Sequence, residues 1–227
     1  MSMTEITYVS LMPKNGTMAK LRRPVVLNSK ASVKVYNALM GVEVIPKITF
    51  EEFRQFPVDG KRYELVCGEV HVTPAPNTRH QFILRRLAAS LERHMARNPT
   101  GEFAFAPLDV RLAADVVLQP DLIFVSVARL DILGEDFVSG VPDIVVEILS
   151  PSTSAHVRAV KIPLYAQAGV PEIWIIDAQA KTVEVLKLQG KKYIVDSVLA
   201  GDQILSSSQL PDWQLPLGEL FAFLPHT

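Results

Sequence analysis

The sequence predicts an α/β (α+β) protein built on a mixed β-sheet that is flanked by helices. Two observations support this. Segments with strand character and segments with helical periodicity follow one another in the order helix, several strands, helix, further strands. In addition, residues 144–149 are apolar at every position but one, which is typical of a strand buried on both faces. Helical layers on both faces of a sheet would provide that burial.

Residues 1–46 differ from the rest of the chain, and we predict an N-terminal extension there, followed by one domain over 47–227. Five of the six methionines lie in this segment, and no helical or alternating period persists in it. Residues 1–42 carry six Lys or Arg and one acidic residue. The segment is a mobile basic arm, a loosely packed extension, or the product of an upstream start codon, and the sequence leaves these readings open.

The domain is expected to begin with a short helix, a hairpin and a long helix. Thr49 and Glu52 have the spacing of a capping box, which predicts a helix over 51–55. Strands are predicted at 62–66 and 69–73 around Gly68. Thr78 is expected to cap a helix over 78–97.

Apolar residues recur on one face of that long helix at the spacing of a core stripe. They are Leu84, Leu87, Ala88, Leu91 and Met95. His80 precedes Leu84 by four residues, so it lies on the core side and needs a hydrogen-bond partner. The opposite face is expected to carry Arg86, Ser90, Arg93 and Arg97.

The second half of the domain is predicted to alternate again between strands and a helix. A helix is expected over 157–168, ended by Gly169 with Pro171 two residues later. The predicted strands are 103–112, 117–125, 142–149, 172–177, 182–188 and 192–198.

Composition and charge exclude several classes of function. Beyond residue 42 the chain has 17 basic and 23 acidic residues, so a broad non-specific nucleic-acid surface is not expected. Cys67 is the only cysteine, which excludes an intrachain disulfide and, with no signal peptide at the start, indicates a reducing cytoplasm. No apolar run approaches the roughly 18 residues of a membrane helix. The chain has neither a P-loop nor a glycine-rich dinucleotide turn.

Two carboxylates stand in apolar strands, where an unpaired charge is costly. Glu147 interrupts the apolar segment 144–149, and Asp121 follows Pro120 at the start of another apolar run. Two such carboxylates can converge on one hard cation, an arrangement that Mg²⁺ prefers. The alternatives are that Glu147 is a buried ion-pair partner of Lys161 or an arginine, and that Asp121 accepts backbone hydrogen bonds at a strand start.

Lys161 follows Glu147 by 14 residues and lies in the predicted helix after the Ser-Pro-Ser-Thr turn at 150–153. A lysine there could reach back over the strand end and, beside a metal ion, orient a water or stabilise charge on a phosphate. Alternatively, it is a solvated helix residue.

Several ordered motifs resemble the Uma-two restriction-endonuclease-like family. The longest is Val-Pro-Asp-Ile-Val-Val-Glu-Ile-Leu-Ser-Pro-Ser-Thr at 141–153. Others are Tyr-Glu-Leu-Val at 63–66, Arg-His at 79–80, Ala-Pro-Leu-Asp-Val-Arg-Leu at 106–112 and Gln-Pro-Asp-Leu at 119–122. The resemblance spans about residues 48–224 and continues through Lys161 and the segments 164–166 and 168–172.

The resemblance implies a restriction-endonuclease-like core of the PD-(D/E)xK nuclease superfamily. It implies that Asp121 and Glu147 are metal ligands, that Lys161 is a migrated catalytic lysine, and that Glu64 is a further ligand. His80 resembles the family's helix histidine and would support a ligand carboxylate by a hydrogen bond; it could equally be a satisfied core histidine. Two positions depart from the family pattern: Val157 stands where an acid is usual, and Pro163 lies inside the helix that carries Lys161.

Two functions follow as hypotheses. The first is a Mg²⁺-dependent DNA endonuclease, with Mn²⁺ as an alternative ion, in which Arg79, Arg86, Arg93 and Arg97 contact phosphates. That row of arginines could instead be a solvated helix face. The second is a catalytically weakened nuclease fold that binds DNA or a protein. A homodimer would suit the two strands of a duplex. A closed cluster in which the lysine bridges the carboxylates would favour the second hypothesis.

Overall fold

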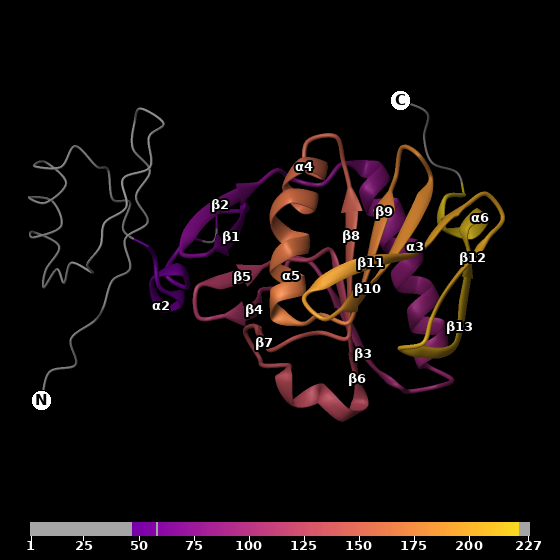
Figure 1. Cartoon of the computed structure of the whole chain (residues 1–227), viewed down its shortest axis with the longest axis horizontal. Coiled ribbons are helices and arrows are strands. Elements are labelled where there is room, and N and C mark those ends of the chain that lie inside the picture. Colours follow the sequence, from indigo (N-terminus) through magenta and orange to yellow (C-terminus); the bar gives the residue numbers. More distant parts are fainter. Residues whose placement is uncertain (1–46, 58, 223–227) are drawn as a thin grey trace, which may run out of the picture. The chain divides into compact units, whose positions relative to one another are not determined.

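The computed structural model describes residues 47–57 and 59–222. The predicted extension, residues 1–46, lies outside the described residues, so the two-part division of the chain stays a prediction. Within the described residues the prediction of a mixed sheet flanked by helices is confirmed (Figure 1).

The largest sheet has six strands and is mixed. Its spatial order is β11 (Lys192–Ala200), β10 (Thr182–Gln189), β9 (Glu172–Asp177), β8 (Ile144–Leu149), β6 (Leu122–Ser126) and β3 (Gly101–Phe105). Strands β8 and β9 run parallel, while every other neighbouring pair is antiparallel. All six residues of β8 are buried, as its apolar sequence predicts.

Helices cover both faces of this sheet. The crossover between the parallel strands is one continuous helix of three parts: α4 (Ser154–His156), a π-helical turn η2 (Val157–Lys161) and α5 (Ile162–Ala168). It packs with Val145 and Leu149 in one core cluster, whereas Val146 and Ile148 pack with α3 (Thr78–Met95) in another. Figure 1 shows α5 and α3 on opposite sides of β8. Glu147 therefore points to the α5 side, because side chains alternate along a strand.

A second sheet of five strands lies next to α2 (Phe50–Phe53). Its order is β2 (Glu69–Thr73), β1 (Arg62–Val66), β5 (Val116–Leu118), β4 (Val110–Ala113) and β7 (Val138–Ser139). The predicted capping box and the predicted hairpin are both confirmed. The hairpin turns through Cys67 and Gly68, which both have positive φ, as a tight two-residue turn between twisted strands requires.

The predictions of single strands over 103–112 and 117–125 are wrong. Each segment is divided between the two sheets: the first into β3 and β4, and the second into β5 and β6. Both breaks contain a proline, Pro107 and Pro120, and proline has no N–H to continue a ladder of hydrogen bonds. The residues on both sides of each break have strand character, so the sequence pattern does not reveal that the strand changes sheet.

Three details of the helices also differ from prediction. Asn77, not Thr78, caps α3, because its side chain accepts the His80 N–H. The helix ends at Met95 rather than at residue 97. Ser90, predicted to face solvent, is buried and accepts a hydrogen bond from the indole of Trp213. The reason is an additional layer of structure that covers this side of α3.

The sequence pattern did not reveal that additional layer. It comprises β12 (Ile204–Ser207), β13 (Leu210–Pro216) and α6 (Leu217–Leu220). Elsewhere in the domain, the 3₁₀ helix η1 (Val127–Ile132) was also not predicted. Trp213 stacks on Trp174 with ring centroids 5.1 Å apart. Because of this layer, α3 is buried on two sides.

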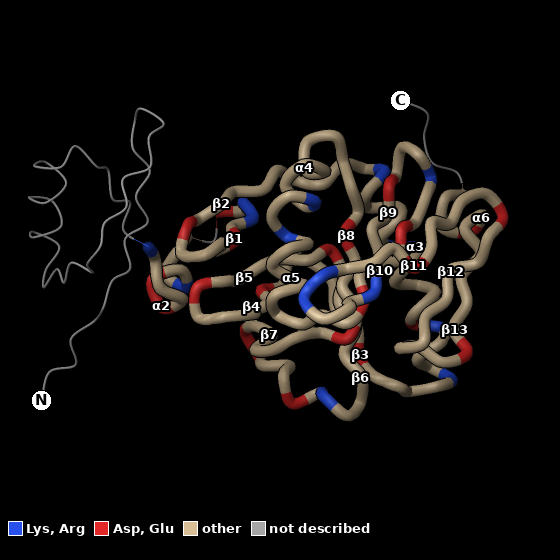
Figure 2. The backbone as a smooth tube through the Cα atoms, in the orientation of Figure 1, with Lys and Arg blue, Asp and Glu red and all other residues tan. Residues whose placement is uncertain are grey.

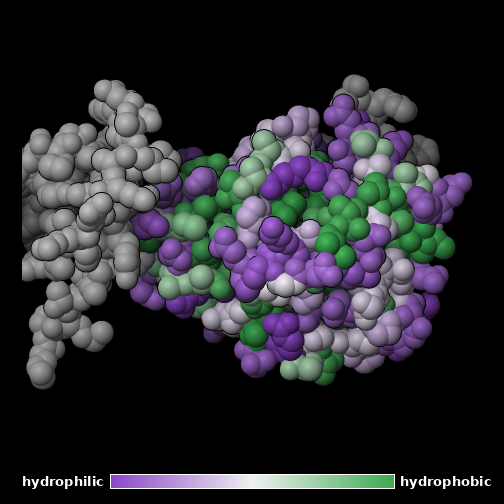
Figure 3. Space-filling model, in the orientation of Figure 1, coloured by the Kyte–Doolittle hydropathy of each residue, from purple (hydrophilic) through white to green (hydrophobic). Residues whose placement is uncertain are grey.

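The surface of the domain is mixed in polarity. Figure 3 shows hydrophobic and hydrophilic residues interspersed on the face in view. No helix in the described ranges is long and apolar enough to cross a membrane.

Candidate active site

The candidate site lies where the chain crosses from one sheet to the other. Gln119, Pro120 and Asp121 connect β5 of the smaller sheet to β6 of the larger one. The Asp121 N–H donates to the carbonyl of Val146 in β8, at 3.1 Å. The crossing therefore places Asp121 beside Glu147 of β8 and leaves β1 of the other sheet opposite.

Asp121 is held by hydrogen bonds from three directions. Its Oδ2 accepts the Ile148 N–H at 2.8 Å and lies 2.9 Å from His80 Nε2. Its Oδ1 lies 3.4 Å from Arg62 Nη1. The inward direction predicted for His80 is thus observed, and His80 contacts the carboxylate that the resemblance assigns to a metal. The backbone donor also agrees with the alternative reading of Asp121 as a strand-start acceptor.

Glu147 and Lys161 form a buried ion pair. Lys161 Nζ lies 2.6 Å from Glu147 Oε1, and the phenolic hydroxyl of Tyr165 donates to the same oxygen at 2.6 Å. Lys161 and Tyr165 are four residues apart on one helix, so both side chains reach the same face. Lys161 is only 3% exposed, which rules out the alternative of a solvated helix residue.

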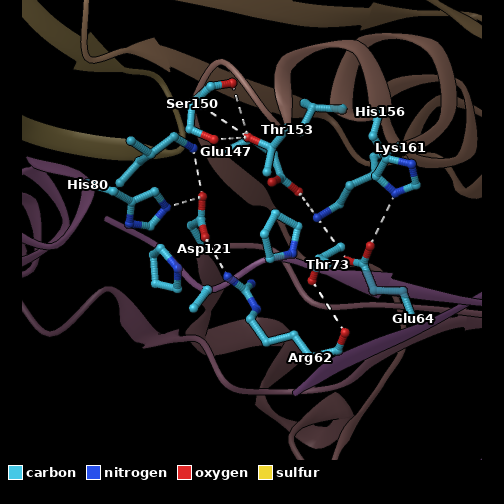
Figure 4. A pocket seen from close by; sticks show the side chains of 15 residues that line it. Arg62, Glu64, Thr73, His80, Asp121, Glu147, Ser150, Thr153, His156 and Lys161 are labelled. Carbon is cyan, nitrogen blue, oxygen red and sulfur yellow. Dashed lines mark hydrogen bonds and ion pairs between the residues drawn. The ribbon is translucent and has the colours of Figure 1, made fainter. Parts of the chain in front are cut away.

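Lys161 also pairs with Glu64 of β1. Its Nζ lies 3.0 Å from Glu64 Oε1 and donates to the carbonyl of Gln119 at 3.2 Å. The other oxygen of Glu64 lies 3.3 Å from His156 Nε2. Figure 4 shows Lys161 extended between Glu147 and Glu64, with Asp121 and His80 to one side. We call this group of Glu64, Asp121, Glu147 and Lys161 the carboxylate pocket.

Burial and mutual charge separate the pKa values of these groups. Burial raises the pKa of Glu147 to about 7, an effect that the carboxylates of Asp121 and Glu64 reinforce and the charge of Lys161 opposes. Burial also acts to raise the pKa of Glu64, but Lys161, His156 and the Gln119 N–H overcome it and lower this pKa to about 2.

The two other groups keep their charge in spite of burial. For Asp121, desolvation is outweighed by His80, Lys161 and Arg62, and its pKa is lowered. For Lys161, desolvation acts to lower the pKa, but the surrounding carboxylates raise it to about 12. Near neutral pH the pocket therefore holds ionised Glu64 and Asp121, a charged lysine, and Glu147 between its two protonation states.

The π-helical turn explains how Lys161 tolerates a proline two residues later. The Ile162 N–H donates to the carbonyl of Val157, five residues earlier, and Pro163 lies at the first turn of α5. Proline is tolerated in the first turn of an α-helix because the N–H groups of that turn have no acceptor within the helix. Pro163 is thus accommodated in the continuous helix, at the junction between the π-helical turn and α5.

The predicted arginines do not gather at the pocket. Arg86 Nη1 donates to the carbonyl of Leu220, and Arg93 lies 4.0 Å from Glu219, so both face α6. Arg97 is exposed beyond the end of α3. Arg79 is different, because it lines a hollow together with Ser150, and Ser150 also lines the carboxylate pocket.

The donor chemistry of the pocket fits a hard divalent cation, because carboxylate oxygens are the ligands that Mg²⁺ prefers. Asp121 and Glu147 would hold it. Among residues 47–57 and 59–222, however, no group of three or more His, Cys, Asp or Glu side chains is arranged to bind a metal. The amino group of Lys161 lies instead between Glu147 and Glu64, so ion binding would require that lysine to shift.

Sequence reasoning missed three side chains of the site: Arg62, His156 and Tyr165. Tyr165 could have been found, since it follows Lys161 by four residues on a predicted helix. Arg62 and His156 carry no such signal, because their partners are 59 and 92 residues away in the chain.

Comparison with known proteins identifies the family of the chain. Residues 50–218 match the family model described as "Uma2: Putative restriction endonuclease". The chain belongs to the Uma2 family. This confirms the resemblance to the Uma-two family and places the chain among restriction-endonuclease-like proteins. No curated protein matches the chain.

A solved structure has the same fold. It is described as a "putative nuclease belonging to DUF820" from Anabaena variabilis ATCC 29413. It aligns with a TM-score of 0.64 and 22% identity, over 77% of this chain and 97% of the other. This likeness shows that the two chains share a fold.

Proposed function

We propose that this Uma2 protein is a divalent-metal-dependent endonuclease that hydrolyses phosphodiester bonds in DNA. The observation that carries the proposal is the convergence of three buried carboxylates and one buried lysine in a single pocket, from four separate segments of the chain. Buried charges cost stability unless they are paired, and a cluster of this kind is a candidate for function.

Asp121 and Glu147, with Glu64 as a further ligand, would hold Mg²⁺ or Mn²⁺. The bound ion would polarise the scissile phosphate and lower the pKa of its water. His80 fixes the orientation of the Asp121 carboxylate through its Nε2, and Tyr165 does the same for Glu147. Such supporting hydrogen bonds hold ligand carboxylates in place.

Two cationic side chains would act on the substrate. Once released from Glu147, the Lys161 ammonium would orient the attacking water or stabilise negative charge on the phosphate. Arg62 lines the pocket beside Asp121 and can bind a phosphate oxygen, since guanidinium groups match phosphate geometry. Each role uses a group that already faces the pocket.

DNA contact would be local rather than spread over one basic face. Figure 2 shows basic and acidic segments interspersed over the domain. Arg79, in the hollow that adjoins the pocket at Ser150, is placed to contact a phosphate next to the cleaved one. Arg86 and Arg93 face α6 and are less suited to that role. A homodimer would present one site to each strand of a duplex.

We also propose a cytoplasmic location for the protein. Cys67 is the only cysteine in the sequence, which agrees with a reducing environment.

A second candidate function is a nuclease fold that binds DNA or a protein without cutting. The specific observation in its favour is the bridge from Lys161 to Glu147 and Glu64, which neutralises the carboxylates without a metal. Val157, in the position where the family usually has an acid, points the same way. The two functions differ in whether an ion displaces the lysine.

The deciding experiment measures Mg²⁺- and Mn²⁺-dependent cleavage of single- and double-stranded DNA by the full chain. The variants are Asp121→Ala, Glu147→Ala and Lys161→Ala, with Lys187→Ala as the matched control, because Lys187 forms a half-exposed pair with Asp196 outside the pocket. Circular dichroism checks folding. Cleavage that is lost in the three variants and kept in the control supports the nuclease. Absence of cleavage, together with no metal binding by calorimetry, supports the binding protein.

A further inference from the structure

A second cavity adjoins the carboxylate pocket. It has a volume of about 420 Å³, and it shares Arg62, His80 and Asp121 with the pocket. That volume lies within the roughly 300–1,000 Å³ of typical small-ligand sites. We call it the side cavity. Nothing in the proposed hydrolysis uses it, although it opens next to the proposed metal ligand Asp121.

One wall of the side cavity is aromatic. Phe53, Phe56 and Tyr63 all line it. The rings of Phe56 and Tyr63 are 5.5 Å apart and those of Phe53 and Phe56 are 5.9 Å apart. Aromatic walls of this kind are surfaces on which nucleobases stack, whatever the base.

The charges around the side cavity suit a nucleotide whose phosphate lies at its inner end. Arg62 stands at the junction with the carboxylate pocket, and two further cations, Arg54 and Lys61, line the cavity. Arg54 is paired with Asp136 and Lys61 with Asp59, so these two are partly neutralised. Arg62 also pairs with Asp121 at 3.4 Å, but it alone of the three lines both cavities, so it is the cation placed to contact the phosphate, with the aromatic wall beyond it.

We infer that the side cavity holds one unpaired nucleoside of the DNA strand, next to a phosphate bound at Arg62 beside the proposed metal ligand Asp121. The inference rests on the proposed function and names its substrate class: single-stranded DNA, or duplex DNA with an unpaired nucleotide beside the cleaved bond. In an intact duplex the face of each base is covered by its neighbours, so a base can reach the wall only when it leaves the stack.

The test uses oligonucleotides that carry one 2-aminopurine, whose fluorescence falls when it stacks. The base is placed in a single strand, as a one-nucleotide bulge in a duplex, or fully paired. Binding to the full-length protein is measured in Ca²⁺ so that binding is read separately from cleavage. We expect quenching and tighter binding for the single strand and the bulge, and neither for the paired duplex.

Two variants test the cavity itself. Phe56→Ala removes part of the aromatic wall and should weaken binding of the bulged DNA by about 5- to 150-fold, the equivalent of one base stack. Gln81→Glu leaves the core intact, since Gln81 is exposed at the cavity lining, and places a negative charge there that should repel the DNA strand and weaken binding of the bulged DNA as well. Phe105→Ala is the control, because Phe105 is 53% exposed and does not line the cavity.

The outcomes separate this inference from the proposed function. Equal binding of paired and unpaired DNA, or quenching that persists in Phe56→Ala and Gln81→Glu, overturns the inference even if the wild type cleaves DNA. Quenching that both variants lose supports the inference even if no DNA is cut, in which case the nuclease proposal alone fails.

Discussion

Replacing Lys161 with methionine gives a direct test of how the carboxylate pocket is stabilised. Methionine keeps most of the volume of the side chain but removes the ammonium group that contacts Glu147 at 2.6 Å and Glu64 at 3.0 Å. Without metal, we expect Lys161→Met to lower the free energy of unfolding by about 3–5 kcal/mol, because removing one partner leaves buried carboxylates without compensation.

The raised pKa of Lys161 points in the same direction as this loss. Its value rises from 10.5 to about 12 on folding, so the charged form is favoured in the folded state. The stability that this provides is complete below pH 10.5 and is lost as the pH rises through 12. At pH 7 it amounts to about 2 kcal/mol. The rest of the expected loss comes from the carboxylates left behind.

The assay is thermal and urea denaturation in EDTA at pH 7. For a domain of this size the loss corresponds to about 6–20 °C in Tm. The control Lys187→Met removes a lysine from a half-exposed ion pair, which is worth at most about 1 kcal/mol. The double variant Lys161→Met/Glu147→Gln should recover part of the loss, since one buried charge is gone. If Lys161→Met were as stable as Lys187→Met, or the double variant less stable than the single one, the reasoning would be refuted.

Three further predictions concern the pocket and the sheet that supports it. Tyr165→Phe removes the hydroxyl that donates to Glu147. It should lower the free energy of unfolding by about 1.5–3 kcal/mol in urea denaturation at pH 8.5, and by clearly less at pH 5.5, where the Glu147 carboxyl is protonated. An equal loss at both pH values would show that the hydrogen bond is not to a carboxylate. The pKa of Glu64 is lowered from 4.5 to about 2, so the stability it contributes, about 3 kcal/mol, is present above pH 4.5 and lost as the pH falls toward 2. Denaturation of Glu64→Gln at several pH values should lack this dependence, and a wild-type advantage that persists at pH 2 would contradict it. Gly101→Ala should lower the free energy of unfolding by several kcal/mol in the same assay, because a Cβ there would lie 2.2 Å from the carbonyl oxygen of Val125. Gly218→Ala is the control and should change this free energy little, because a Cβ at Gly218 would meet nothing within 4 Å. Similar values for the two glycine variants would be unexpected.

Neighbouring residues in the chain encode the local elements of this protein. The capping box at Thr49 and Glu52, the hairpin at 62–73 and the buried strand 144–149 are encoded by neighbours in the chain, and all three are observed. The inward direction of His80 also followed from helical spacing alone. The ordered motifs were specific enough to indicate the Uma2 family, which the family match confirms.

The sheet that each strand joins and the pairing of the carboxylates depend on long-range packing and could not be predicted from local patterns. The breaks at Pro107 and Pro120 divide two apparently continuous strands between two sheets, and strand alternation is the same in either sheet. The bridge from Lys161 to Glu64 joins residues 97 positions apart. Chemical type and spacing predict that a buried acid needs a partner, but which partner it meets depends on how the two sheets pack, because that packing sets the distances and the burial on which each charge depends.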